Sequence, residues 1–168
     1  PEAWPNDPSG SWPGGLGGEN AQGSAGVIST VTRTEGSVAY SDDSVVDDSL
    51  GTVNLKVGEQ YVPISAEAAS IAVEQATRVP GRSDHDIALH LDRTTTAPGA
   101  YPLVLISYQI FCSGYEDAET VELVKTFGQY VISPEGQEAS AEAAKSAPIP
   151  QGLAEDAKAA IESITTLP

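Results

Sequence analysis

The residues that most resemble a metal-binding or catalytic cluster are Asp84 to Asp86, which read D-H-D, together with His90. Imidazole and carboxylate groups are zinc ligands, and a protein zinc site takes three or four of them. His85 and His90 are five residues apart, which places them on opposite faces of a strand and on separated parts of a helix. No third nitrogen or sulfur ligand accompanies them. The cluster therefore predicts no metal site.

A catalytic nucleophile is equally unsupported. No G-x-S-x-G motif accompanies the histidines, and neither histidine stands in a motif that pairs with Cys112, the only cysteine. The 24 acidic residues are too many for sequence to select a catalytic pair. We expect no enzyme activity and no cofactor, and we expect Cys112 to be a small buried residue on an apolar central strand.

Two further clusters have structural explanations. Gly14 to Gly18 is rich in glycine but lacks the G-K-[ST] ending of a phosphate-binding loop, so a turn is favoured. The next segment holds four aspartates without the spacing of a calcium loop, at Asp42, Asp43, Asp47 and Asp48. The first two suit a helix N-terminus, where carboxylates meet unpaired amides.

The charge of the chain limits its partners. The net charge is −16 with a pI near 4.1, which disfavours binding to nucleic acid and anionic lipid. A phosphate site on such a surface would depend on close-range hydrogen bonds and oriented dipoles. No apolar run is long enough for a membrane span. The chain begins at Pro1 and holds no methionine, so we expect its native start to lie outside these residues.

The first half of the chain alternates short elements. A Gly/Pro-rich loop up to Gly26 is anchored by Trp4, Trp12 and Leu16. The pattern then predicts a helix at 27–31 that Gly36 stops, followed by a strand at 37–40. A short helix from 42 to about 50 comes next, and then a hairpin at 52–64 that turns at Gly58. The last element of this half is a helix that Ser65 caps and Pro80-Gly81 closes.

Helices and strands also alternate in the second half of the chain. We expect a half-buried strand within 82–93, an apolar strand from Tyr101 to Cys112, a helix capped by Asp117, a second helix after Pro134, and a terminal amphipathic helix from Leu153 to Ile164. Helices and strands that alternate along the chain predict an α/β fold.

Several of these segments resemble, in the same order, segments of the phosphate-binding proteins that serve ABC transporters. Those binding proteins are about twice as long as this chain. The matching motifs are P-E-A-W at Pro1 to Trp4, the glycine-rich stretch from Gly17 to Val27, G-S-V-A-Y at Gly36 to Tyr40, A-Y-P-L around Tyr101, C-S-G-Y-E-D-A from Cys112, and A-P-I-P at Ala147 to Pro150. The resemblance is to the C-terminal part of the family.

This resemblance implies part of a two-lobed periplasmic-binding-protein, or Venus-flytrap, fold that closes by a hinge. Residues 1–92 would belong to the second lobe, 93–101 to a hinge or crossover, and 102–168 to the C-terminal part of the first lobe. The polar, Pro- and Gly-bearing composition near 93–101 supports a connector between two clusters of secondary structure.

The implied function is that of the phosphate-binding subunit of an ABC-type uptake system, which captures inorganic phosphate and delivers it to the permease. Such a protein is exported to the periplasm or the outer face of the cell membrane, with or without a lipid anchor. The alternative is a related exported protein that binds another oxyanion or acts in sensing or adhesion.

The family's ligand motifs precede the position equivalent to Trp4, so no phosphate-binding residue transfers to this chain. The R-S-D run at Arg82 to Asp84 stands elsewhere in the order and is followed by His85. We therefore expect the isolated chain to bind phosphate weakly or not at all, and to associate with the N-terminal segment or with another copy of itself. In an intact exported protein, Cys112 would have an upstream cysteine as partner.

Overall fold

The computed structural model describes residues 6, 7, 9, 11 and 15–168, and divides the chain into two compact units, Pro1–Leu50 and Gly51–Pro168. Trp4, Trp12, Gly14 and the P-E-A-W motif lie outside the described residues, so their expected roles stay predictions. The division between Leu50 and Gly51 differs from the expected lobes 1–92 and 102–168, which also stay a prediction.

Among its described residues, the first unit holds the helix α1 (Gly23–Arg33) and the 3-10 turn η1 (Asp43–Val45). The predicted helix start at Asp42 is confirmed, because its carboxylate accepts a hydrogen bond of 2.9 Å from the Ser44 amide. The turn ends at Val45, short of the expected position near 50. The strand expected at 37–40 is wrong. Val38 and Tyr40 are exposed, and no strand among the described residues pairs with them.

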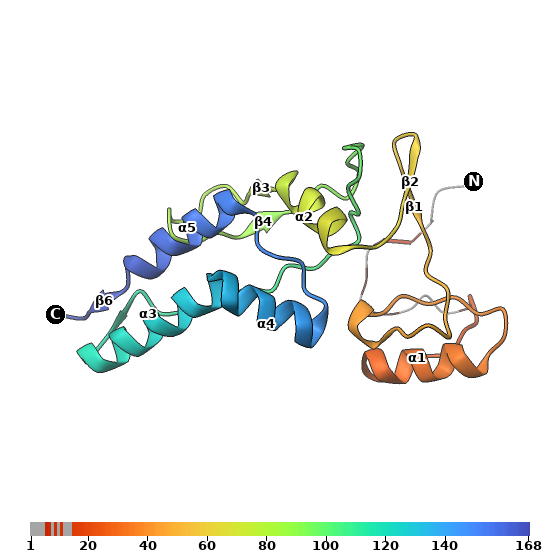
Figure 1. Cartoon of the computed structure of the whole chain (residues 1–168), viewed down its shortest axis with the longest axis horizontal. Helices are drawn as coiled ribbons and strands as arrows, with labels where there is room; N and C mark the ends of the chain where they lie inside the picture. Colours follow the sequence, from red (N-terminus) through yellow and green to blue (C-terminus); the bar gives the residue numbers. More distant parts are fainter. Residues whose placement is uncertain (1–5, 8, 10, 12–14) are drawn as a thin grey trace. The chain divides into compact units, whose positions relative to one another are not determined.

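The second unit combines helices with small two-stranded sheets, as Figure 1 shows. Its helices are α2 (Ala66–Glu74), α3 (Ala118–Ile132), α4 (Pro134–Ala144) and α5 (Gln151–Glu162). Its strands are β1 (Leu55–Val57), β2 (Gln60–Val62), β3 (Thr77–Arg78), β4 (Leu89–His90), β5 (Gly114–Tyr115) and β6 (Thr165–Thr166). The pairs β1–β2 and β3–β4 are antiparallel, and β5–β6 is parallel. The mixture of helices and strands is confirmed.

The predicted hairpin forms one end of this unit. Strands β1 and β2 pair around Gly58, whose φ of 57° lies in the left-handed region that favours glycine. Val57 and Val62 are buried together with Ala68 of α2, and Tyr101 packs against this cluster. The Tyr101 amide donates to the Ala68 carbonyl at 2.9 Å, which brings a later segment of the chain onto the helix.

Helices α3, α4 and α5 form the other end, where α3 packs against both of the others (Figure 1). Gly128 of α3 faces Ile161 of α5 so closely that a Cβ atom at Gly128 would lie 3.1 Å from the Ile161 side chain. Ala157, Ile161 and Ile164 are buried, so the predicted amphipathic character of the terminal helix is confirmed. The close approach of the two helices depends on the glycine.

The helix starts follow the sequence closely. Ser65 accepts from the Ala68 amide at 3.1 Å, and Asp117 accepts from the Thr120 amide at 2.7 Å. Ser133 caps α4 in the same way, with Pro134 at its first position, where a missing N–H has no cost. Helix α2 ends at Glu74, however, because β3 follows at Thr77, well before the expected stop at Pro80-Gly81.

The apolar strand expected from Tyr101 to Cys112 is wrong. These residues form no regular strand, and Leu105 and Ile110 are 93% and 91% exposed. Cys112 is exposed, in contrast to the expected burial on a central strand. A β-strand requires a partner with which to exchange backbone hydrogen bonds, and the part of the chain that the structure describes provides none here. The strand expected within 82–93 is confined to β4.

No helix within the described residues has both the length and the apolar character that crossing a membrane requires. The sheets remain separate two-stranded pairs, so the expected two-lobed arrangement with a hinge at 93–101 stays a prediction.

Candidate functional site: the loop between β3 and β4

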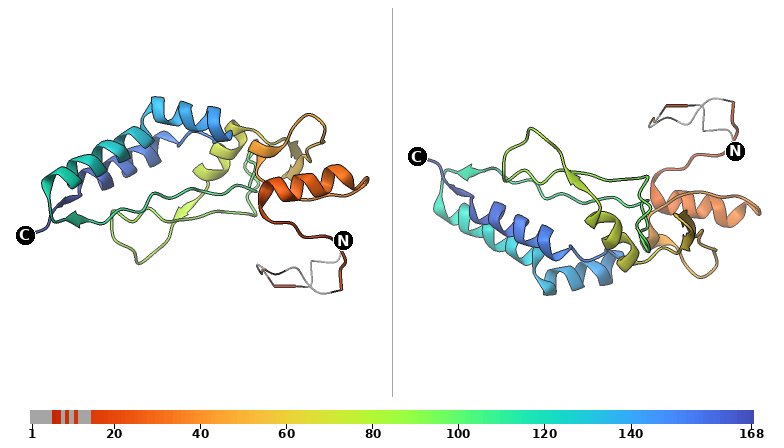
Figure 2. Two further views of the ribbon diagram at one scale, coloured as in Figure 1. Left: turned by 90° about the horizontal axis from the view of Figure 1, so that it is seen from below. Right: turned by 90° about the horizontal axis from the view of Figure 1, so that it is seen from above.

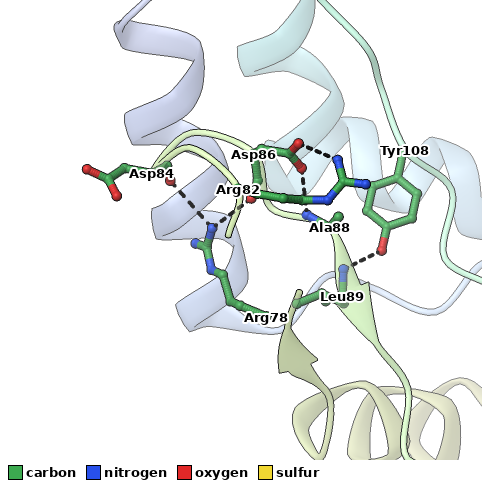
Figure 3. Close-up of polar contacts among 7 residues, drawn as sticks. All are labelled: Arg78, Arg82, Asp84, Asp86, Ala88, Leu89 and Tyr108. Atoms are coloured by element: carbon green, nitrogen blue, oxygen red, sulfur yellow. Dashed lines mark hydrogen bonds and ion pairs between the residues drawn. The ribbon is translucent and has the colours of Figure 1, made fainter. Parts of the chain in front are cut away.

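The loop between β3 and β4 brings two arginines and two aspartates together (Figure 3). The antiparallel register pairs Arg78 with Leu89, so the ten residues between the two strands form a closed loop. Gly81, with a φ of 79°, makes the turn that an L-residue rarely adopts. Arg78, Arg82, Asp84 and Asp86 line a hollow of about 310 Å³ on this loop. Because arginine is the side chain best suited to oxyanions, the hollow is the place to test for phosphate binding.

The first arginine of the hollow, Arg82, is held by Asp86 in an ion pair of 2.6 Å (Figure 3). The Asp86 carboxylate also accepts a hydrogen bond of 3.1 Å from the Ala88 amide. The hydrogen bond from Arg82, followed by the one from the Ala88 amide, holds the pKa of Asp86 below its usual value. This carboxylate is therefore ionised at neutral pH and occupies the position that an anion would take beside Arg82.

The second arginine, Arg78, is held in several directions. Its Nη2 lies 2.6 Å from Oδ2 of Asp156 on helix α5. Its Nη1 donates to the backbone carbonyls of Asp84 and Asp86 at 3.5 and 3.4 Å (Figure 3). The guanidinium thus connects the loop to α5. A further hydrogen bond, of 2.9 Å from the Leu89 amide to the Tyr108 hydroxyl, fixes β4 against the segment that precedes β5.

This arrangement stabilises the loop and does not favour an anion. A phosphate would have to displace Asp86 from Arg82 or Asp156 from Arg78, and the carboxylates would repel it at close range. The hollow is also open to solvent, and both partners of the Arg78 pair are about half exposed. We interpret these contacts as a structural link between the loop and α5.

The other residues considered from sequence do not form a site. His85 and His90 are exposed, and no group of three or more metal-ligating side chains occurs among the described residues. Gly15 and Gly17 have positive φ values and no heavy atom within 4 Å of an added Cβ, as expected of an open turn. Asp47, like Asp42, receives a hydrogen bond from a backbone amide two residues on.

The pair of Arg78 and Asp156 was missed by sequence reasoning. Neither residue belongs to a motif: Arg78 ends the two-residue strand β3, and Asp156 lies within the 12-residue helix α5. Their long separation along the chain leaves no local signal of the contact. Arg78 and Arg82 are visible in the sequence as two cations four residues apart, but this spacing does not reveal which carboxylates hold them.

The relatives found by comparison with known proteins are named as phosphate-binding proteins. The chain is 32% identical over 170 residues to phosphate-binding protein PstS 2 of Mycobacterium tuberculosis strain H37Rv, and equally to PstS2 of Mycobacterium bovis BCG. It is 33% identical over 138 residues to phosphate-binding protein PstS 3 of Mycobacterium leprae. The first two matches cover 97% of this chain and the third covers 74%.

The chain spans less than half the length of these relatives, 44% of the first two and 36% of the third. No protein-family model matches it, and no solved structure matches it significantly.

Proposed function

We propose that this chain, which belongs to the family of PstS phosphate-binding proteins and matches their C-terminal part, serves in the phosphate-binding subunit of an ABC-type phosphate uptake system. In this role the subunit captures inorganic phosphate outside the cell and delivers it to the membrane permease. The observation that carries the proposal is the identity of 32% over 97% of the chain. An identity of this extent along nearly every element favours a shared fold.

Within that subunit, we assign the 168 residues to the scaffold. Tight phosphate binding needs several donors that converge in a desolvated cleft. In the described part of the chain, the loop between β3 and β4 brings arginines together, and its guanidinium groups are held by Asp86 and Asp156. The ligand residues of the subunit would then lie in the part of the family protein that these residues do not match.

The proposal also covers where the subunit acts and whether it changes phosphate chemically. The subunit would be exported, to the periplasm or the outer face of the membrane, and it would bind phosphate without turning it over. The relatives are named as binding proteins, which favours this class over an enzyme. The permease subunits would be its macromolecular partners.

A chimera tests the proposal directly. In PstS 2 of M. tuberculosis, the matched 44% would be replaced by this chain, and phosphate and sulfate binding would be measured by calorimetry. We expect a folded chimera that binds phosphate in preference to sulfate. A folded chimera that binds neither anion would contradict the proposal, and one that prefers sulfate would favour the related class of oxyanion-binding proteins.

A matched control identifies failures of folding. The same chimera with Ile161→Lys places a charge in the contact between α3 and α5, where Ile161 is 6% exposed. It should lose both its helical circular dichroism and phosphate binding, because a buried unpaired charge is costly. An Arg82→Gln chimera should keep phosphate binding, since Arg82 is held by Asp86.

A further inference from the structure

Residues 92–102 form a closed loop after strand β4 in the second unit, and we name them the connector loop. Arg93 joins the two ends of this loop, because its Nη1 donates a hydrogen bond to the carbonyl of Pro102. At the start of the loop, the Asp92 carboxylate accepts hydrogen bonds of 2.9 and 2.8 Å from the amide and the hydroxyl of Thr94. The ends of the connector loop are therefore held by its own side chains.

A tight turn shapes the rest of the connector loop. The Ala100 amide donates to the Ala97 carbonyl at 3.1 Å. Between them stand Pro98, whose ring fixes its own φ, and Gly99, which has a φ of 81°. A proline followed by a glycine with positive φ is typical of a type II turn. The backbone path of the loop thus follows from its own residues.

The end of the connector loop packs on helix α2, which lies beside it in both views of Figure 2. The Tyr101 amide donates to the Ala68 carbonyl of α2 at 2.9 Å. A Cβ atom at Gly99 would lie only 3.3 Å from Cδ1 of Ile71 on the same helix. Ala100, between these two contacts, is completely buried. Packing this close couples the position of the loop to that of α2.

The middle of the connector loop packs on the turn of the β1–β2 hairpin. A Cβ atom at Gly58 would lie 3.3 Å from the Thr96 carbonyl oxygen and 3.8 Å from the Thr96 Cβ. The hairpin is itself packed on α2, since Val57 and Val62 share one buried cluster with Ala68. The loop therefore contacts two elements that already form one packed body.

We propose that the connector loop, α2 and the β1–β2 hairpin move as one rigid body, and that Arg93 is the positioning residue that closes the loop. A hinge is a short run of residues that absorbs large changes in φ and ψ, and the contacts of residues 92–102 oppose such changes. In a subunit that closes on its ligand, the bend then lies outside 92–102, which is an alternative to the hinge expected at 93–101. This consequence rests on the proposed function, whereas the rigidity of the loop does not.

Hydrogen exchange of the 168-residue chain tests the rigid body. The Tyr101 amide should exchange at least about a hundredfold more slowly than in an unstructured peptide, and within about threefold of the amide of Ala72, a buried residue of α2. Arg93→Met removes the guanidinium and should accelerate the exchange of Tyr101 about tenfold or more. Fast exchange of Tyr101 in the original chain, or exchange that Arg93→Met leaves unchanged, would overturn the proposal.

The matched control is Arg33→Met. It removes the same charge from an exposed arginine of α1 in the first unit, where Arg33 donates to the Ser29 carbonyl of its own helix at 3.0 Å. This variant should leave the exchange of Tyr101 unchanged. Equal acceleration by the two variants would show that loss of charge explains the effect, and would contradict the role of Arg93.

A disulfide between the loop and the hairpin tests where the bend lies. In a Cys112→Ser background, Gly58→Cys/Thr96→Cys places two Cβ atoms 3.8 Å apart, which is the usual separation in a disulfide. Oxidation should form this bond within one chain. The positive φ of Gly58 strains the oxidised and the reduced form alike, so the reduced form is the matched reference.

The chimera with PstS 2 carries this disulfide into phosphate binding. Its oxidised form should bind phosphate within about twofold of its reduced form, because the bond joins parts that do not move apart. The same chimera without the two new cysteines is the control and should not respond to oxidation. An affinity that falls about tenfold or more only in the oxidised cysteine pair would show that the loop moves on closure, and would overturn the proposal. A chimera that binds no phosphate in either form would contradict the proposed function, while the exchange of Tyr101 would still decide whether the loop is rigid.

Discussion

Nη2 of Arg78 lies 2.6 Å from Oδ2 of Asp156, and this ion pair connects strand β3 to helix α5. The same guanidinium donates to the carbonyls of Asp84 and Asp86. Arg78 therefore fixes the loop between β3 and β4 in place, while the neighbouring Arg82 is held separately by Asp86.

The two partners of this pair should differ in their effect on stability. Asp156→Asn removes one exposed ion pair and should cost less than about 1 kcal/mol in the free energy of unfolding. Arg78→Ala should cost about 1 kcal/mol more, since two loop carbonyls also lose their donor. Urea unfolding measures both, and the Asp156→Asn effect should shrink at high salt. Equal losses in the two variants would contradict this role of Arg78.

The contact between α3 and α5 should dominate the stability of the second unit. Ile161→Ala should cost about 2–5 kcal/mol, and Ile161→Val about 0.5–1.5 kcal/mol, because Ile161 is buried against Gly128. Leu123→Ala on the exposed face of α3 is the control and should change the free energy by about 0.5 kcal/mol or less. Similar losses at Leu123 and Ile161 would show that α5 does not pack as described.

The Asp117 cap of α3 should make the stability of the chain depend on pH, with the stabilisation lost as the pH falls. The backbone N–H of Thr120, then its hydroxyl, lowers the pKa of Asp117 in the folded chain. Its stabilisation is therefore complete above the unfolded pKa of about 3.9 and is lost as pH falls through the lower folded value. Asp117→Ala should lower the midpoint of thermal unfolding at pH 7, and the difference should shrink below pH 4.

A control separates this cap from acidity in general. Asp48→Ala, at an exposed position in the other unit, should leave the midpoint nearly unchanged at both pH values. A difference between the original chain and Asp117→Ala that grows on acidification would contradict the assigned sign.

The features that sequence predicted well are those set by neighbouring residues. Ser65 and Asp117 cap their helices because a side-chain oxygen reaches an amide three residues on, and Gly58 allows the hairpin turn. Both signals are local. Pro134 likewise starts α4 where the pattern placed it.

The features that failed depend on distant partners. The apolar character of the segment ending at Cys112 predicted a buried strand, but burial requires a second strand and a covering layer, which no local pattern reveals. The structure leaves Leu105 and Cys112 exposed. The candidate site shows the same limit, since the acceptors of Arg78 include Asp156, which is far along the sequence on α5.

We propose that these 168 residues supply scaffold to a phosphate-binding protein and hold none of its ligand residues. Calorimetric titration of the isolated chain with inorganic phosphate tests this claim most directly, with PstS 2 of M. tuberculosis as the positive control in the same buffer. We expect no saturable heat for the isolated chain up to about 1 mM phosphate. A dissociation constant of about 1 µM or tighter would contradict it.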